Sequence, residues 1–290
     1  MKNIAVLGAG TMGHGIAHVA AVSGFSTRLY DVDEPALARG LGKIRATLDG
    51  GVQRGKLTEE LRDAALARLS GSTQLDAVLA DVDAVIESVP ERMDLKRRLA
   101  TEVGGRVPGV LFGTNTSSLS VTEIAAAHPR PERVVGLHFF NPPHVMKLLE
   151  VVRGMATSPE TLAEARALGA SLGRELIVVN DSAGFATSRL GLVLGLEAIR
   201  MLEQGVASAV EIDQAMKLGY RHPMGPLELT DLVGLDVRLA IAEHLHRELG
   251  DAFRPPQLLR TYVRAGWLGK KSGRGFYCWD GDTARPAPVA

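Results

Sequence analysis

The sequence predicts an α/β protein, with a doubly wound sheet followed by an all-helical C-terminal domain. Short aliphatic runs alternate with helical patterns over the first two thirds of the chain, which is typical of parallel βαβ units with helices on both faces of the sheet. A glycine-rich turn joins the first strand to the first helix, and the strand pattern stops near Asp181. A chain of 290 residues suits two domains. We therefore expect domains at 1–181 and 182–290.

The strands of the first domain are β-branched or aliphatic runs, several of them with acidic or glycine punctuation. We expect strands at Asn3–Leu7, Thr27–Asp31, Ala84–Ser88, Val110–Gly113, Val134–Phe139, Met146–Val152 and Glu175–Val179. Helical patterns lie between them, at Met12–Ser23, Glu34–Gln53, Glu59–Leu69, Asp94–Val103 and Glu160–Leu172.

The second domain shows helical periods and one weak strand. The expected helices are Phe185–Gln204, Val210–Leu218, Leu227–Val233, Asp236–Leu249 and Pro256–Ala265, with a strand at Gly275–Trp279 and a frayed tail after it. The stretch from Leu190 to Leu196 is apolar almost all round, which predicts burial on every side. It belongs either in the centre of the helical domain or in a subunit interface.

Composition narrows the class of protein. The 33 basic residues balance the 33 acidic ones, so the whole molecule offers no charge footprint for nucleic acid or anionic lipid. Cys278 is the only cysteine, which excludes an intrachain disulfide and four-cysteine zinc patterns and favours a reducing, cytoplasmic compartment. No signal peptide is expected, and the most apolar stretch is far shorter than the roughly 20 residues that span a bilayer. We expect a soluble protein without a membrane partner or a metal.

The turn Gly8-Ala9-Gly10-Thr11-Met12-Gly13 predicts a Rossmann-like dinucleotide site. In this motif the first glycine permits the tight turn, the second lets the pyrophosphate approach the backbone, and the third lets helix and strand pack closely. The free N–H groups at the start of the helix then face the phosphate charge. A structural turn is the other interpretation.

Asp31 ends the next expected strand, 18 residues after Gly13. A carboxylate there accepts hydrogen bonds from both ribose hydroxyls and repels a 2′-phosphate, so the cofactor is predicted to be NAD. Arg28, on the same strand, weakens the case against NADP.

His138 ends the strand Val134–Phe139, where ligands collect in open α/β sheets. Glu150 follows within an apolar run and needs a partner if that run is a strand, because an unpaired buried carboxylate is costly. A histidine held by a carboxylate suits alcohol oxidation, since the hydroxyl proton needs a base while hydride leaves the carbon. The alternative is a histidine at a strand end beside an edge-strand glutamate, with no chemical role.

Asn115-Thr116-Ser117-Ser118 also follows an expected strand. These side chains could bind the substrate oxygen or the nicotinamide, or could cap the helix that begins near Val121.

These segments, in this order, resemble the short-form 3-hydroxyacyl-CoA dehydrogenases, particularly those of the bacterial 3-hydroxybutyryl-CoA type. The resemblance covers nearly the whole chain. It rests on GAGTMGHGIA (8–17), ERMDLK (91–96), NTSSLS (115–120), GLHFFNPPHVMKLLEV (136–151), AMKLGYRHPMGP (215–226) and YVRAGWLGKKSGRGFY (262–277).

The resemblance implies roles for individual residues. His138 would be the catalytic acid/base, Glu150 its orienting partner, and Ser117 a hydrogen-bond donor to the reacting oxygen. The positions that would contact NAD, besides the glycine loop and Asp31, are Glu91, Lys96, Asn115, Ser117, Asn141 and Lys271. The acyl-CoA would lie in a cleft between the domains, and the helical domain would form a homodimer.

One position departs from the family pattern. The family commonly has asparagine in the helix after the Gly-Phe pair, as a further contact to the substrate oxygen, and this chain has Ser188. Ser188 can still donate one hydrogen bond, so we expect retained activity with an altered rate or substrate preference. Coenzyme A phosphates could meet the basic cluster near the second helix, for which Arg54 and Lys56 are the candidates. A solvated helix face explains the same cluster equally well.

The sequence thus predicts NAD-dependent, reversible oxidation of an (S)-3-hydroxyacyl-CoA, such as 3-hydroxybutyryl-CoA, to the 3-ketoacyl-CoA. A second hypothesis is a related dehydrogenase of a free hydroxy acid, such as a sugar acid or carnitine. A third is a non-catalytic NAD-binding protein, which would have no need of both His138 and Glu150.

Overall fold

The computed structural model describes residues 1–287 and divides into two compact units, one from Met1 to Ser182 and one that begins at Ala183. Within residues 1–287, no helix is both long and apolar enough to cross a membrane. The same residues bring together no group of three histidine, cysteine or acidic side chains that could hold a metal ion.

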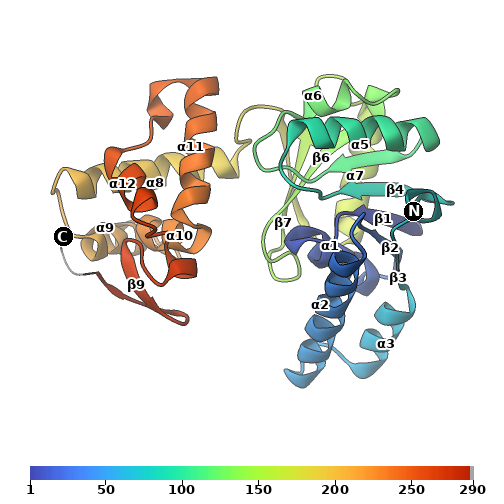
Figure 1. Ribbon diagram of the computed structural model, residues 1–290, viewed down its shortest axis with the longest axis horizontal. Coiled ribbons are helices and arrows are strands. Elements are labelled where there is room, and N and C mark those ends of the chain that lie inside the picture. The colour runs from blue at the N-terminus through green and yellow to red at the C-terminus, as the bar shows by residue number, and fades with distance from the viewer. Residues whose placement is uncertain (288–290) are drawn as a thin grey trace. The chain divides into compact units, whose positions relative to one another are not determined.

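The N-terminal unit is built on one eight-stranded sheet (Figure 1). Its strands are β1 (Asn3–Leu7), β2 (Ser26–Tyr30), β3 (Leu69–Ser72), β4 (Ala84–Glu87), β5 (Leu111–Thr114), β6 (Val134–Phe139), β7 (Leu148–Arg153) and β8 (Glu175–Asn180). They lie in the order β3-β2-β1-β4-β5-β6-β7-β8, and every neighbouring pair is parallel except β6 and β7. The predicted doubly wound sheet is confirmed.

Four helices of this unit begin at a side-chain cap. The helices of the unit are α1 (Thr11–Val22), α2 (Glu34–Gln53), α3 (Glu59–Ala67), α4 (Leu75–Leu79), α5 (Met93–Arg106), α6 (Val121–Ala125) and α7 (Pro159–Ser171), with a 3-10 turn at Pro131–Arg133. The side chains of Asp33, Thr58, Ser120 and Ser158 accept hydrogen bonds from the first turns of α2, α3, α6 and α7.

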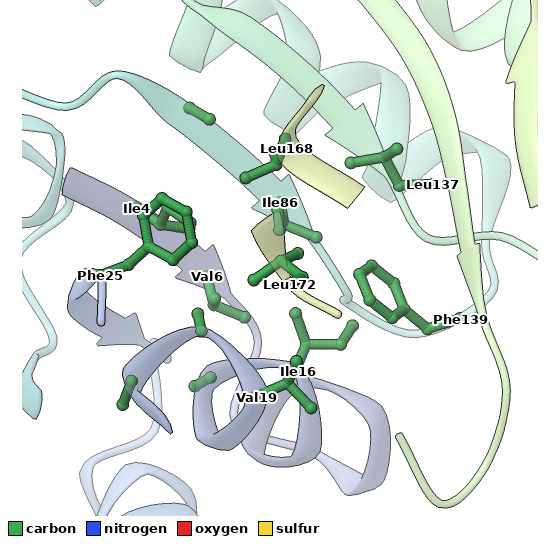
Figure 2. Packing of buried hydrophobic residues seen from close by; sticks show 14 of the residues in the cluster. Ile4, Val6, Ile16, Val19, Phe25, Ile86, Leu137, Phe139, Leu168 and Leu172 are labelled. Carbon is green, nitrogen blue, oxygen red and sulfur yellow. The ribbon is translucent and has the colours of Figure 1, made fainter. Parts of the chain in front are cut away.

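Alternation along the strands separates the two faces of the sheet. On one face, Ile4 and Val6 of β1, Ile86 of β4 and Leu137 and Phe139 of β6 pack with side chains of α1 and of the α7 region in one apolar cluster (Figure 2). The residues between them in sequence point to the other face. Glu87, His138 and Glu150 therefore share a face that does not contribute to this core.

Two features of the sheet differ from the prediction. The strands β6 and β7 are antiparallel, because the segment between Phe139 and Leu148 is too short for the helical crossover that a parallel pair needs. Strand β3 was not predicted, since the sequence Leu69-Ser-Gly-Ser has little apolar character, and it lies at the sheet edge. The five-residue helix α4 was also missed.

The C-terminal unit is helical except for one hairpin. Its elements are α8 (Thr187–Glu203), α9 (Ala209–Gln214), a π turn (Ala215–Gly219), α10 (Pro226–Val233), α11 (Leu235–Leu249), α12 (Gln257–Arg264), 3-10 turns at Asp251–Phe253 and Lys270–Ser272, and strands β9 (Tyr277–Asp280) and β10 (Thr283–Pro286). We predicted a frayed tail after Trp279. That prediction is wrong for the residues up to Pro286, because β10 pairs antiparallel with β9.

Two buried aspartates attach this hairpin to the helices. Asp231 accepts hydrogen bonds from the N–H groups of Phe276 and Tyr277 and from the Trp279 indole, at 2.8 to 2.9 Å. Asp213 accepts one from the Tyr277 hydroxyl at 2.7 Å. Burial raises the pKa values of both carboxyls. The end of the C-terminal motif, Phe276 and Tyr277, therefore has a structural role.

The sequence predicted that the apolar stretch of α8 is buried on every side. On the single chain it is not. Leu192 and Leu196 lie in the core of the C-terminal unit, each 1% exposed. Leu190 and Leu194 are 63% and 42% exposed on the single chain. Part of the α8 surface is therefore apolar and accessible.

Candidate active site

The glycine loop links β1 to α1, and each glycine meets a different steric demand. Gly8 has a positive φ of 102°, and a Cβ there would lie 2.6 Å from the Ser88 carbonyl oxygen. A Cβ on Gly13 would lie 1.7 Å from the Gly8 oxygen, so only glycine fits both positions. Gly10 has no heavy atom within 4 Å of its Cβ position. That open space beside the helix start is where a pyrophosphate would approach.

Asp31 follows β2 directly and is tied to the loop. The Ala9 N–H donates to Asp31 Oδ2 at 2.9 Å, and the Asp33 N–H donates to Oδ1 at 3.1 Å. The carboxylate is thus fixed beside the glycine turn, where the ribose of a dinucleotide lies in this motif.

Arg28 is engaged elsewhere. Its guanidinium donates to the carbonyl oxygens of Val78 and Ala80, at the end of α4. The arginine that complicated the choice between NAD and NADP in the sequence is therefore held by backbone acceptors.

Glu91 accepts several hydrogen bonds from the segment after β5. Its Oε1 accepts hydrogen bonds from the Thr116 hydroxyl (2.6 Å) and from the N–H groups of Ser117 (2.9 Å) and Ser118 (3.3 Å). The Ser117 hydroxyl also lies 3.3 Å from this oxygen. Burial raises the pKa of Glu91, but the charge of Lys96 and these hydrogen bonds outweigh it and hold that pKa below its ordinary value. Two residues predicted to bind NAD, Glu91 and Ser117, are thus in contact.

Lys96 lies beneath this cluster, with no side-chain exposure. Its Nζ donates to both oxygens of Glu87 (2.8 and 3.1 Å) and to the Asn115 carbonyl oxygen (3.1 Å), and it lies 3.5 Å from Glu91 Oε2. Since an ammonium has three donors, the described residues already satisfy it. Lys96 thereby holds Glu91, and its contact with NAD stays a prediction.

The side chain of Asn115 also forms hydrogen bonds within the protein. The Phe139 N–H donates to Asn115 Oδ1 at 3.0 Å, which joins the ends of β5 and β6. The remaining amide group lies 3.4 Å from the Ser88 hydroxyl.

His138 and Glu150 are direct cross-strand neighbours in β6 and β7. His138 Nδ1 lies 2.6 Å from Glu150 Oε2, a charge-assisted hydrogen-bond distance. The histidine is 6% exposed and the glutamate fully buried, and the Phe140 ring lies 4.4 Å from the imidazole, centroid to centroid. The carboxylate therefore selects the ring orientation and places Nε2 on the opposite side of the imidazole.

The other predicted residues are described within their own units. Asn141 is exposed after β6, and Arg54 and Lys56 are exposed just beyond α2, where Arg54 covers Gly50. In the C-terminal unit, Ser188 is half-buried in the first turn of α8, and Lys271 forms an ion pair of 2.5 Å with Asp236.

Sequence reasoning missed two charged groups. Glu87, fully buried in β4, is the main partner of Lys96, and an acid inside the apolar run Ala84–Glu87 was the available signal. Arg238 is 7% exposed in the C-terminal unit. Its position in the apolar repeat of α11 could have identified it.

The doubly wound sheet and the glycine loop between β1 and α1 together define a dinucleotide-binding α/β protein. The model of the 3-hydroxyacyl-CoA dehydrogenase NAD-binding domain matches residues 3–182, and that of the C-terminal domain of the same family matches residues 184–279. The chain belongs to the 3-hydroxyacyl-CoA dehydrogenase family, which is a family of NAD-dependent oxidoreductases.

Individual relatives are similar over nearly the full length of this chain. A probable 3-hydroxybutyryl-CoA dehydrogenase of Bacillus subtilis is 47% identical over 287 residues, which is 98% of this chain and 99% of the relative. A 3-hydroxyadipyl-CoA dehydrogenase of Escherichia coli is 44% identical over 96% of this chain and 59% of that protein. The crystal structure of (S)-3-hydroxybutyryl-CoA dehydrogenase from Ralstonia eutropha superposes with a TM-score of 0.93 at 42% identity, covering 97% and 99% of the two chains.

Proposed function

We propose that this chain oxidises the 3-hydroxyl group of an (S)-3-hydroxyacyl-CoA to a ketone, reversibly, with NAD as the hydride acceptor. The observation that carries the proposal is the hydrogen-bonded pair of His138 and Glu150 at the end of β6, in a chain of this family. Bound NAD supplies the site that accepts or returns the hydride.

The N-terminal unit offers groups that fit NAD. The open space at Gly10 and the N–H groups at the start of α1 suit the pyrophosphate, and Asp31 suits the ribose hydroxyls. Glu91, Ser117 and Asn141 are proposed contacts on the nicotinamide side, and Lys271 is a proposed contact from the C-terminal unit. Thr11 and Met12 continue the glycine loop.

His138 is the proposed general base of the oxidation. With Nδ1 on Glu150, proton exchange with the substrate hydroxyl falls to Nε2. The buried carboxylate stabilises the imidazolium that forms, and in the reverse reaction the imidazolium returns the proton to the substrate oxygen. Ser117 and Ser188 are the proposed donors to that oxygen.

The relatives differ in the end of the acyl chain on which they act. Their names include the uncharged 3-hydroxybutyryl group and the 3-hydroxyadipyl group, which ends in a carboxylate. The thioester-linked 3-hydroxyacyl unit is common to both, and it is the substrate class that we propose. Arg54 and Lys56 are proposed contacts for coenzyme A.

An absorbance assay of NADH formation tests this function. We expect turnover with NAD and (S)-3-hydroxybutyryl-CoA and little with free 3-hydroxybutyrate. Equal or faster oxidation of the free acid would instead favour a hydroxy-acid dehydrogenase, and absence of turnover with any hydroxyacyl-CoA would contradict the proposal. NADP in parallel tests the role of Asp31.

We also propose that the chain forms a homodimer through its C-terminal unit. Large apolar side chains are accessible on three helices that pack together there, namely Leu190 and Leu194 on α8, Leu229, Leu232 and Val233 on α10, and Val237 on α11. Light scattering after size exclusion should give twice the chain mass, and Leu194→Glu should shift it toward the monomer. A monomeric wild type would contradict this. A cytoplasmic location is proposed from the single cysteine.

A further inference from the structure

Arg238 occupies an apolar position in the C-terminal unit. The buried residues of α11 are Leu235, Arg238, Ala242 and Leu245, which follow helical spacing on one face. The other three belong to the hydrophobic core of this unit, and Arg238 is 7% exposed among them. Arginine is almost never buried to this degree unless it is paired.

One donor of this guanidinium has no acceptor among residues 1–287. The Nε–H of Arg238 is enclosed and has no hydrogen-bond partner among the described residues. Burial alone lowers the pKa of Arg238 to about 10, with no contribution from a neighbouring acid. A guanidinium carries five donors, so burial without an acceptor is costly.

The guanidinium lies beside Gly191 of α8. Its NH1 atom lies 3.8 Å from the position that a Cβ on Gly191 would occupy. Ser188, Gly191 and Gly195 lie three or four residues apart, so they share one face of α8. A Cβ on Gly195 would lie 3.0 Å from the Thr230 hydroxyl of α10. This row of small residues, Ser188, Gly191 and Gly195, therefore begins at Ser188 and passes beside Arg238.

We propose that Arg238 binds a carboxylate at the far end of the acyl chain, so that the enzyme favours 3-hydroxyacyl-CoA substrates derived from dicarboxylic acids. This inference rests on the proposed function and on the contact of Ser188 with the substrate oxygen. A carboxylate accepts two parallel hydrogen bonds from a guanidinium and neutralises its charge, which is the interaction that the buried side chain lacks.

The spacing suits a short chain. Gly191 follows Ser188 by one helical turn, which is about 4.5 Å along the axis. In an extended chain of about six carbons, the terminal carboxylate lies a comparable distance beyond the carbon that bears the hydroxyl. The terminal methyl group of a chain of the same length would leave the guanidinium without an acceptor.

Steady-state kinetics on a matched pair of substrates tests the proposal. 3-Hydroxyadipyl-CoA ends in a carboxylate, and 3-hydroxyhexanoyl-CoA has the same chain length but ends in a methyl group. For the wild type we expect kcat/KM to be about 10- to 100-fold higher for the adipyl substrate. Equal values, or a preference for the hexanoyl substrate, would overturn the proposal while leaving the general dehydrogenase function intact. Failure with both substrates and with 3-hydroxybutyryl-CoA would instead contradict the proposed function.

Variants assign the preference to this side chain. Arg238→Met should abolish the preference mainly through KM for the adipyl substrate, with hexanoyl turnover retained, and Arg238→Lys should restore part of it. Arg247→Met removes an exposed arginine from the same helix and should change neither. If Arg238→Met keeps the wild-type preference but weakens self-association, the acceptor is a group of a second copy and the proposal is wrong. Because the wild-type comparison stands alone, a variant that fails to fold does not remove the test.

Discussion

Lys96 and Arg238 are buried cations in different units, and their surroundings are opposite. Lys96, in the N-terminal unit, has acceptors for all its donors from Glu87 and Asn115 and lies near Glu91. Arg238, in the C-terminal unit, is nearly as buried, and its Nε–H has no hydrogen-bond partner in the part of the chain that the structure describes.

The difference separates two uses of a buried charge. A saturated cation fixes the residues around it, so Glu91 and the segment after β5 are held in place without a ligand. An unsaturated cation gains its acceptor only when something binds. We infer that the NAD-side groups are preorganised in the N-terminal unit, and that a charge in the C-terminal unit contributes to substrate choice.

The largest effect is expected from Lys96→Met, which tests whether the buried lysine stabilises the N-terminal unit. Glu87 would stay buried without its cation, so we expect the free energy of unfolding to fall by about 3–5 kcal/mol. Urea unfolding measures it. The double variant Glu87→Gln/Lys96→Met removes the stranded charge and should recover part of the loss. A change below about 1 kcal/mol in the single variant would show that the network does not stabilise the unit.

Glu150→Gln tests preorganisation at the proposed catalytic pair. The amide keeps the shape but cannot stabilise the imidazolium, so kcat should fall about 10²- to 10⁴-fold. NAD affinity, measured by fluorescence titration, should stay within about twofold because Glu150 is not among the groups proposed to contact the cofactor. An unchanged kcat would remove Glu150 from the mechanism.

Arg238→Met should have the opposite sign from Lys96→Met in stability. Replacing an uncompensated buried charge with an apolar side chain should raise the free energy of unfolding by about 1–3 kcal/mol. The same urea assay, without substrate, measures it. Destabilisation comparable with that of Lys96→Met would mean that Arg238 has a structural partner after all.

The smallest effect is expected from Ser188→Ala. One neutral hydrogen bond to the substrate oxygen contributes about 0.5–1.5 kcal/mol, so kcat/KM should fall about threefold to tenfold. The C-terminal unit should remain equally stable. Identical kinetics would show that the hydroxyl makes no productive contact, and would also weaken the placement of the acyl chain along α8.

Sequence patterns predicted the features that depend on local order. Alternation and glycine spacing located β1, β6 and α2 with the bounds that the structure has, and they predicted the doubly wound sheet. The sequence patterns did not predict strand β3 or the antiparallel pairing of β6 with β7. Strand β3 has few apolar residues, and the pairing depends on tertiary structure.

Site geometry was less accessible from the sequence. The strand register that places Glu150 opposite His138 could be suspected from two neighbouring strands, whereas the pairing of Lys96 with Glu87 needs three-dimensional packing of α5 against the sheet. The unpartnered Nε–H of Arg238 could not be predicted at all, since it depends on which groups every neighbouring helix presents.

The central claim is that His138 exchanges a proton with the 3-hydroxyl group of an acyl-CoA while NAD takes the hydride. The most direct test measures NADH formation and NAD binding on one preparation of His138→Gln. We predict that kcat for 3-hydroxybutyryl-CoA falls by about 10³-fold or more while the dissociation constant for NAD stays near that of the wild type. Turnover within about tenfold of the wild type, with NAD binding intact, would contradict the claim.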